Sequence, residues 1–157
     1  MSSKTPPKAI AIASDHAGFQ LKSQLKQDLA DMGYAVVDLG TNGQESVDYP
    51  DFGYAMADAL RSGRAGRGVL VCGSGIGISI AANRHPMVRA ALVHDALGAR
   101  MSRLHNDANV ICFGGRMIGS DVARDCLKVF LETTFEGGRH ERRVEKLSSP
   151  PTGNKTK

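Results

Sequence analysis

The chain has 157 residues, of which 41% are hydrophobic and 23% charged, which is typical of one folded domain and excludes a disordered or fibrous protein. A net charge of +4 would suit nucleic acid, but only 5% of the residues are aromatic and no nucleic-acid motif is present. No apolar run approaches the ~20 residues of a membrane helix, and the N-terminus lacks the apolar segment of a signal peptide. We therefore expect neither a nucleic-acid nor a membrane partner.

The cysteines and the chain ends set further limits. Cys72, Cys112 and Cys126 are odd in number and form no CxxC pair, so they predict neither a disulfide framework nor a zinc site. Free thiols are typical of the cytoplasm, which is the location we expect. We expect one domain over residues 8–147, and flexible tails at 1–7 and 148–157, where Ser, Pro, Thr and Lys predominate.

In the first half of the chain, short apolar runs alternate with helical periodicity. Strands are expected at 8–14, 34–40 and 68–72, with one amphipathic helix in each interval. Pro50 is expected in the loop before the second helix. The helical stripes are Leu21, Leu25, Leu29 and Met32, followed by Gly33, and Phe52, Met56 and Leu60, followed by Gly63.

The same alternation continues in the second half. A glycine turn after residue 72 leads into a short helix that ends near Asn83, and strands are expected at 88–94 and 109–114. Asp95 is expected to cap the next helix. A break at 137–138 precedes a short basic helix. The apolar stripes are Leu97, Met101 and Leu104 in one helix, and Val122, Cys126, Val129, Phe130 and Thr133 in the next.

Five strands alternating with helices predict a single doubly wound α/β domain, with a five-stranded parallel sheet covered by helices on both faces. Ligands of such sheets bind beyond the carboxyl ends of the strands. Polar residues that follow the strands are therefore expected to meet at one edge of the sheet. They are Asp15, His16, Asp48, Tyr49, the turn 72–77, His94, His105 and Arg116.

The glycine turn CGSGIG (72–77) carries the clearest chemical signal. It lacks the lysine and the spacing of a nucleotide P-loop, and its G-x-G-x-G pattern after the third strand differs from a dinucleotide fingerprint. Glycines at the start of a helix expose successive backbone N–H groups, which can bind a phosphate or an oxyanion formed during a reaction. A tight turn without any ligand remains the alternative.

Cys72 opens this turn. A thiol beside such N–H groups can act in catalysis, although a lone cysteine at a strand end is more often a buried apolar residue. Cys112, in a strand, and Cys126, on an apolar helix face, are interpreted as core residues.

Three polar segments leave a structural and a chemical interpretation open. SDHAG (14–18) can be a helix cap with an exposed His16, or an acid and an imidazole at the end of a strand. RLHNDANV (103–110) can be a polar turn. In EGGRHERRVEKL (136–147), Arg139 and Arg143 share one helix face and suit a phosphate monoester, but a solvated charged helix is the commoner case.

Six motifs are spread along the segment from about Lys8 to Leu147. They are SDHAG (14–18), VDYPDF (47–52), CGSGIGISIAANR (72–84), HNDANV (105–110), FGGRMIG (113–119) and EGGRHERRVE (136–145). In this order they resemble the type B ribose-5-phosphate isomerases, whose superfamily also contains galactose-6-phosphate isomerase subunits. The resemblance implies interconversion of ribose 5-phosphate and ribulose 5-phosphate, a reaction of the pentose phosphate pathway, without a metal or organic cofactor.

The resemblance also implies roles for single residues. Cys72 would be the base that moves a proton from C2 to C1, in contrast to relatives that use a glutamate elsewhere. Ser74, where the family often has threonine, would move protons between the oxygens. The enediolate would be stabilised by the backbone of Gly73, Ser74, Gly75, Ile76 and Gly77.

At the other end of the substrate, the family match implies the following contacts. His105 would open the furanose ring, assisted by Asp15 or Tyr49, and Asn106 would bind the sugar. The phosphate would be bound by His16, Arg116, Arg139 and Arg143. In the family the site is completed across a homodimer interface, so one chain alone is expected to be incomplete.

Two alternative functions are an isomerase of six-carbon sugar phosphates and a nucleotide-binding module. A six-carbon substrate such as allose or galactose 6-phosphate would need the same scaffold and the same reaction class. A non-catalytic nucleotide-binding module belongs to a different class, and the missing P-loop lysine argues against it.

Overall fold

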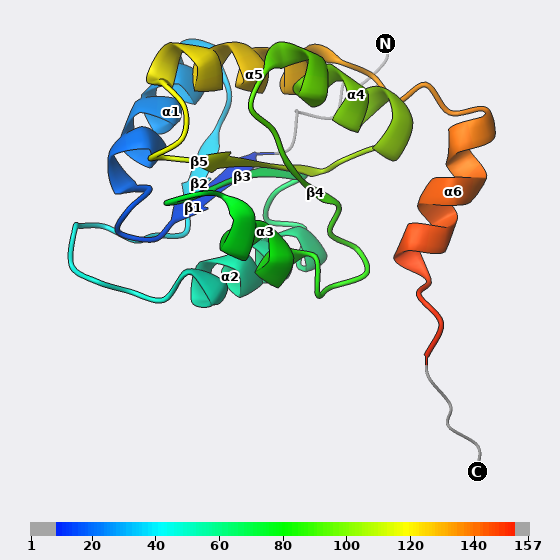
Figure 1. Ribbon diagram of the computed structural model, residues 1–157, viewed down its shortest axis with the longest axis horizontal. Coiled ribbons are helices and arrows are strands. Elements are labelled where there is room, and N and C mark those ends of the chain that lie inside the picture. The colour runs from blue at the N-terminus through cyan, green and yellow to red at the C-terminus, as the bar shows by residue number, and fades with distance from the viewer. Residues whose placement is uncertain (1–8, 153–157) are drawn as a thin grey trace, which may run out of the picture.

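The computed structural model describes residues 9–152 of the chain (Figure 1). The expected tail at 1–7 and the last five residues of the tail at 148–157 lie outside the described residues. The strands are β1 (Ile10–Ser14), β2 (Val36–Asp38), β3 (Arg67–Cys72), β4 (Ala90–Leu92) and β5 (Val110–Gly114). The helices are α1 (Phe19–Asp31), α2 (Tyr49–Arg61), α3 (Ile76–Ala82), α4 (Ala96–Asn106), α5 (Ser120–Glu132) and α6 (Arg139–Ser148).

All five strands run parallel, in the order β2-β1-β3-β5-β4. Helices α1, α4 and α5 cover one face of the sheet, and α2 and α3 cover the other (Figure 1). Helix α6 lies apart from both layers, beside the end of α4. The expected doubly wound α/β fold is confirmed. Among the described residues, no helix has the length and apolar character to span a bilayer.

Each face of the sheet has its own core, because the central strands are buried on both sides. Ile12 and Phe113 pack toward α1, α4 and α5, together with Phe130 of α5. Leu70 and Cys112 point the other way, toward Met56 of α2. Continuous apolar runs such as VLVC and VICF are what strands buried on both faces require.

Most sequence signals at the helix ends are confirmed. The side chain of Asp95 accepts a hydrogen bond from the amide of Gly98 at 2.7 Å, so it caps α4 as expected. Gly33 follows α1 with a φ of +88°, a left-handed conformation that glycine adopts without strain. Pro50 was expected in a loop and instead lies in the first turn of α2, where its missing N–H has no helical partner to lose.

The predicted inward stripe of α4 is wrong. Leu97 is 61% exposed and Met101 is 37% exposed. The buried face of this helix carries Ala99, Ser102 and Arg103. Its polar groups are satisfied locally, since Ser102 donates to the carbonyl of Ala99 at 2.8 Å and Arg103 donates to nearby carbonyls. Leu97 and Met101 of α4 therefore lie at the surface, and Leu104 is half-buried.

A buried ion pair fixes α1 against the edge strand β2. Lys22 is 1% exposed, and its Nζ lies 2.6 Å from a carboxylate oxygen of Asp38. Lys26 contacts the other oxygen at 3.1 Å, and the amide of Gly40 also donates to this carboxylate. Burial acts to raise the pKa of Asp38, but the three hydrogen bonds outweigh it and hold the pKa below its usual value. The carboxylate is therefore the form that this fold stabilises.

We expect Asp38→Asn to lower the free energy of unfolding at pH 7 by about 3 kcal/mol, because it leaves the Lys22 ammonium buried without a counter-ion. The lowered pKa makes this contribution complete above the unfolded carboxyl's pKa of about 3.9, and it is lost as the pH falls through the folded value. The difference between wild type and variant is therefore expected to shrink below about pH 4. Urea unfolding at a series of pH values measures it.

Asp58→Asn is the matched control. Asp58 pairs with Arg61 at 2.9 Å, but both side chains are exposed. The expected cost is below about 1 kcal/mol. Equal destabilisation by the two substitutions would show that the buried ion pair contributes no more to the free energy of unfolding than an exposed one.

Candidate active site

The order of the strands places an opening at the carboxyl edge of β1 and β3. The chain leaves β1 toward α1 on one face and leaves β3 toward α3 on the other, so the two connections diverge between these neighbouring strands. Such a switch point is where open α/β sheets bind ligands. A hollow of about 640 Å³ lies there. It is lined by Asp15, His16, Ala17, Tyr49, Cys72, Gly73, Ser74, Ile76, Gly77, Ile80, Arg116 and Met117.

The glycine turn forms the floor of this hollow. Gly75 has a φ of +76°, and a Cβ there would lie 2.6 Å from Leu92 Cδ1 and 2.7 Å from the carbonyl carbon of Phe113. Its amide donates to the sulfur of Cys72 at 3.1 Å. A Cβ at Gly77 would meet the ring of Tyr49 at 2.5 Å. Close packing therefore requires glycine at these two positions. The hydrogen bond from Gly75 holds the thiol against the turn.

The backbone N–H groups of residues 73–76 fall into two sets. Those of Gly75 and Ile76 are engaged within the turn, with the sulfur of Cys72 and with Ser74 Oγ at 3.2 Å. Those of Gly73 and Ser74 donate to no acceptor among the described residues. Two free donors thus lie next to the thiol in the lining of the hollow, where an oxyanion could accept from them.

The segment after β1 supplies an acid and an imidazole. Asp15 is buried, and one of its oxygens accepts from the amide of Gly18 at 3.0 Å, so it also holds the turn before α1. His16 is half-buried, and its Nδ1 accepts from the amide of Val47 at 3.2 Å. The neutral ring therefore carries its proton on Nε2. Asp15 therefore has the structural role that SDHAG allowed, and its chemical role stays a prediction.

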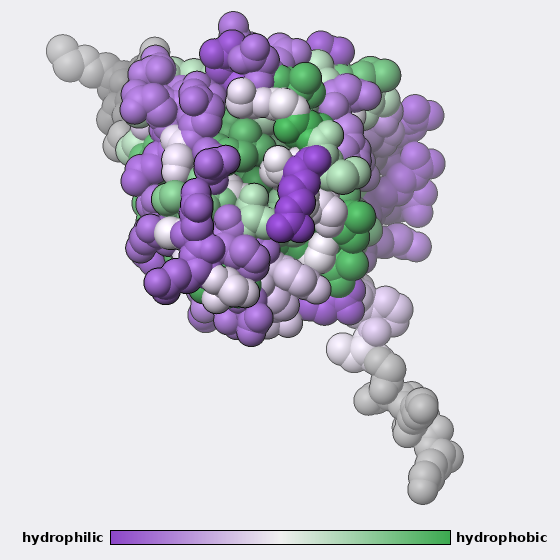
Figure 2. Space-filling view, turned by 60° about the vertical axis from the view of Figure 1, so that its left-hand side comes forward, coloured by the Kyte–Doolittle hydropathy of each residue, from purple (hydrophilic) through white to green (hydrophobic). Residues whose placement is uncertain are grey.

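Arg116 and Tyr49 come from different elements and both line the hollow. Arg116 follows β5, and its guanidinium lies 3.3 Å from where a Cβ of Gly73 would be. Tyr49, at the start of α2, is 42% exposed. Figure 2 brings this edge of the sheet forward and shows hydrophobic residues at the centre of the face with hydrophilic residues around them. The exposed apolar side chains of the lining are Ile76, Ile80 and Met117.

The expectation that His105 lies at this edge is wrong. Because α4 runs antiparallel to the strands, its last turn returns to their amino ends, on the side of α6 and opposite the carboxyl ends (Figure 1). The amide of Asn109, three residues past the helix, donates to the carbonyl of Arg89, just before β4. Asp48 and His94 do not line the hollow either.

The turn that follows His105 is held by two arginines. Asp107 has a left-handed backbone with a φ of +46°, and its carboxylate contacts Arg103 at 2.8 Å and Arg89 at 3.4 Å. The side chain of Asn109 bridges the amide of Arg89 and the carbonyl of Met87. Asp107 and Asn109 are thus structural. The side chains of His105 and Asn106, in the same motif, take no part in the contacts that hold this turn.

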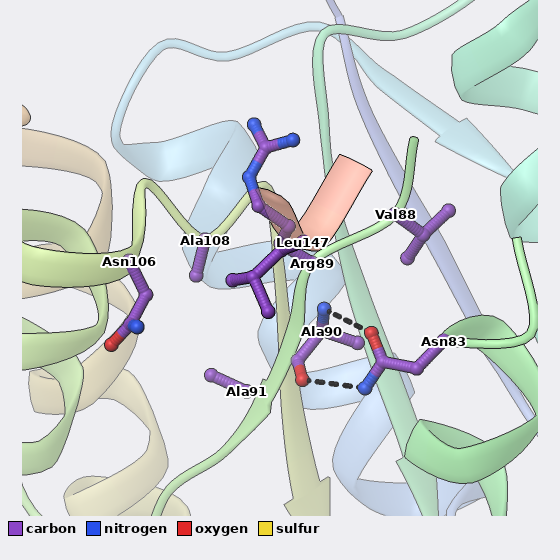
Figure 3. Close-up of a pocket in the computed structure, with 8 residues that line it drawn as sticks. All are labelled: Asn83, Val88, Arg89, Ala90, Ala91, Asn106, Ala108 and Leu147. Carbon is purple, nitrogen blue, oxygen red and sulfur yellow. Dashed lines mark hydrogen bonds between the residues drawn. The ribbon is translucent and has the colours of Figure 1, made fainter. Parts of the chain in front are cut away.

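Asn106 lies in a separate hollow of about 390 Å³, between β4 and the end of α6 (Figure 3). Leu147 of α6 and Ala91 of β4 are also among its lining residues. At its side, the amide group of Asn83 exchanges two hydrogen bonds with the backbone of Ala90, at 2.8 and 2.9 Å. Within one chain, Asn106 and Cys72 therefore line two different hollows.

His105 contacts a residue that sequence analysis missed. Its ring stacks on that of His140, with centroids 4.1 Å apart and planes 14° apart. Its Nε2 also lies 3.7 Å from a carboxylate oxygen of Glu136. His140 and Val144 have a spacing of four residues, which marks the buried face of α6 and could have revealed His140. Arg139 and Arg143 lie exposed beside this face.

The other two cysteines are core residues, as expected. Cys112 and Cys126 are fully buried. Burial, with a smaller effect from Cys72, raises the pKa of Cys112 well above its usual value. Burial raises the pKa of Cys126 to about 11, together with the nearby carboxylates of Asp125 and Asp95. Neither thiol ionises readily, so Cys72 is the cysteine available to the hollow.

The doubly wound fold and the hollow at its switch point are typical of α/β enzymes that bind an anionic substrate at the carboxyl edge. Comparison with known proteins gives the family. The family model described as "Ribose/Galactose Isomerase" matches residues 10–147. The ribose-5-phosphate isomerase B of Escherichia coli is 41% identical over 142 residues, which cover 90% of this chain and 95% of that protein.

Solved structures agree with this match. The ribose-5-phosphate isomerase B of Clostridium thermocellum superposes with a TM-score of 0.88 at 50% identity, covering 89% of this chain and 95% of that one. A ribose 5-phosphate isomerase from Thermotoga maritima gives 0.89 at 47% identity, covering 91% and 99%. The chain belongs to the ribose/galactose isomerase family and is an isomerase.

We expect Gly75→Ala to lower the free energy of unfolding by about 2–5 kcal/mol, because left-handed strain and overpacking against Leu92 and Phe113 add up. Thermal or urea unfolding of the variant measures the loss.

Gly63→Ala separates the two causes. Gly63 has a nearly identical φ of +78°, and in the described part of the chain nothing lies within 4 Å of where its Cβ would be. Its expected cost is the strain alone, about 1–2 kcal/mol. If both variants lose the same stability, close packing at Gly75 is not a constraint.

Proposed function

We propose that the chain interconverts D-ribose 5-phosphate and D-ribulose 5-phosphate through ring opening and an enediolate, with Cys72 as the base. The family membership and the names of the similar proteins support the substrate. The observation that carries the chemistry is one hollow in which a thiol lies beside two free backbone N–H groups.

The reaction requires a proton to leave C2 of the open aldose and to reach C1. The Cys72 thiolate takes the C2 proton, the electron pair moves to the carbonyl, and the negative charge appears on O1. The same thiol returns the proton to C1 while the carbonyl forms at C2. Ser74 moves a proton between O2 and O1 to complete the exchange. The amide of Gly75 keeps the sulfur in place for both transfers.

The enediolate is the costly species, because its charge is poorly stabilised in water. The free amides of Gly73 and Ser74 are its first donors, and the engaged amides of Gly75 and Ile76 would join only by releasing the sulfur and Ser74 Oγ. Gly77 completes the predicted anion hole. Loss of one such donor in other enzymes costs roughly 3–4 kcal/mol, so this turn can supply a large part of the rate enhancement.

The phosphate and the ring-opening group define the other end of the site. Arg116 and His16 line the hollow, and their N–H groups suit a phosphate dianion. His105, Asn106, Arg139 and Arg143 lie on the far side of the same chain, so they act on a substrate held by a second copy. Their position supports a homodimer with two shared sites.

The exposed apolar side chains fit this arrangement. Ile76 and Ile80 of α3 are each 51% exposed, and Leu97 of α4 is also exposed. Contact between copies would remove such side chains from water, at about 25 cal/mol per Å² of apolar surface. Ile76 and Ile80 would then both line the hollow and contact the second copy.

No step of this mechanism needs a metal ion or an organic cofactor. The base, the oxyanion donors and the ring-opening histidine all come from the chain itself. An isomerisation assay with ribose 5-phosphate in the presence of EDTA tests both the reaction and its metal independence. The same assay with allose and galactose 6-phosphates tests the six-carbon alternative, and a higher kcat/KM for either one would replace the proposed substrate.

We expect Cys72→Ala and Cys72→Ser to lower kcat by about 10²–10⁴-fold while KM changes little, because a positioned base contributes that much and does not hold the substrate. Cys112→Ala is the control, since this thiol lies in the same core but outside the lining of the hollow. Near-normal turnover by both Cys72 variants would remove this residue from the role of base.

Mixing two inactive variants tests the shared site. Cys72→Ala and His105→Ala, each inactive alone, are expected to recover about a quarter of wild-type activity after joint refolding. Half of the dimers formed are mixed, and each mixed dimer has one site with both residues intact. No recovery, with mixed dimers demonstrated by a tag on one variant, would show that each site belongs to one chain.

A further inference from the structure

The His140 side chain is unusual in being buried without a hydrogen bond. It is 5% exposed, and its Nε2 has no hydrogen-bond partner among the described residues. A buried polar atom without a partner is costly, so such an atom in a folded protein calls for an explanation. The ring faces His105 in a near-parallel stack.

His140 is also an anchor of α6. It and Val144 are the buried residues of this helix, which otherwise stands apart from the two layers (Figure 1). The segment before the helix is tied to α4, because the amide of Glu136 donates to the carbonyl of Leu104 at 3.2 Å. The His140 ring is thus a direct contact between the helix that carries Arg139 and the histidine proposed to open the sugar ring.

A metal centre is the obvious alternative for this cluster. One ligand atom from each of His105, Glu136 and His140 lies within 4.8 Å of the others. The lone pair of an imidazole nitrogen lies in the plane of its ring, and zinc binds it at about 2.0–2.1 Å. Two rings that stack with planes 14° apart direct their lone pairs side by side and not toward one ion. The geometry favours a histidine stack.

We propose that His140 is a positioning residue, which holds the ring of His105 in the orientation needed for ring opening and ties it to the helix that carries the phosphate-binding arginines. This inference rests on the proposed isomerase function. Through the stack, a movement of α6 toward a bound phosphate also moves the plane of His105.

The charge of the pair agrees with this role. Burial lowers the pKa of His140, and His105, Arg139 and Arg143 lower it further, while Glu136 opposes them. Because its pKa is lowered, His140 stays neutral at pH values at which a free histidine is already largely protonated. His105 can then take up a proton during ring opening without a second positive charge against its face.

Ring opening belongs to both directions of the reaction. Ribose 5-phosphate exists mainly as a furanose, which must open before the proton transfer, and the reverse reaction closes the same ring in the same site. A group that serves this step changes kcat, whereas a group that only holds the phosphate changes mainly KM. The split between kcat and KM, together with rescue by a second flat ring, therefore tests the role of His140.

The test compares three variants of the full chain, with EDTA present. We expect His140→Ala to lower kcat from ribose 5-phosphate by about 10–100-fold with little change in KM, since a small misplacement of a reacting group costs this much. His140→Phe keeps a flat ring against His105 and is expected to restore most of this rate. Val144→Ala loosens the other anchor of α6, and is expected to change KM more than kcat.

The outcomes separate the two proposals. If the wild-type chain turns over neither substrate, the proposed function fails. If the wild type is active and His140→Ala raises KM without lowering kcat, or if His140→Phe is as slow as His140→Ala, only the role of His140 fails. Circular dichroism of each variant ensures that folded protein is compared, and His140→Phe keeps the test decisive should His140→Ala not fold.

Discussion

At the carboxyl edge of the sheet, three loops pack against one another through their backbones. The amides of Gly115 and Arg116 donate to the carbonyls of Cys72 and Gly73, at 2.8 and 3.0 Å. A Cβ at Gly114 would lie 2.6 Å from the carbonyl oxygen of Ser74, so no side chain fits there. Since the loops share one backbone layer, the position of each one fixes the others. The thiol and the arginine keep their spacing through this layer, with no contact between the two side chains needed.

The same layer explains why the site combines rigidity with open donors. Regular secondary structure uses nearly all backbone N–H groups, and a turn that must bind an anion has to leave some of them free. Here the left-handed Gly75 directs its own amide to the sulfur, while the two amides before it stay unpaired. A buried Asp15 does similar work at the neighbouring loop, with one oxygen in the turn before α1.

The fold was predictable because its signals are local. Periodicity and turn signals together located the strands and helices of the described residues, and short-range capping located the start of α4 at Asp95. The stripe of α4 failed because the sequence pattern of Leu97 and Met101 is the same whether these side chains face a core or the surface. Burial of Arg103 was equally hidden, since its partners, such as the carbonyls of Thr133 and Ala108, are backbone atoms brought near by the fold.

The site was only partly predictable, for a topological reason. Residues directly after a strand, such as His16 and Arg116, must lie at the carboxyl edge. A residue at the end of a crossover helix, such as His105, must lie at the opposite edge, whatever motif surrounds it. The family resemblance brought His105 into the site, but chain order placed it on the wrong side. His140 was overlooked because the two arginines beside it dominated the interpretation of that helix.

The amide of Asn83 has a consequence for how copies of this chain can assemble. β4 is an edge strand, and such an edge normally offers its backbone as a template for another strand. Here the side chain of Asn83 occupies both groups of Ala90, in the place that a neighbouring strand would take. Sheets of separate molecules cannot fuse at this residue into an open-ended fibre. An added strand would first have to displace the Asn83 side chain, so this edge resists the strand pairing that leads to aggregation.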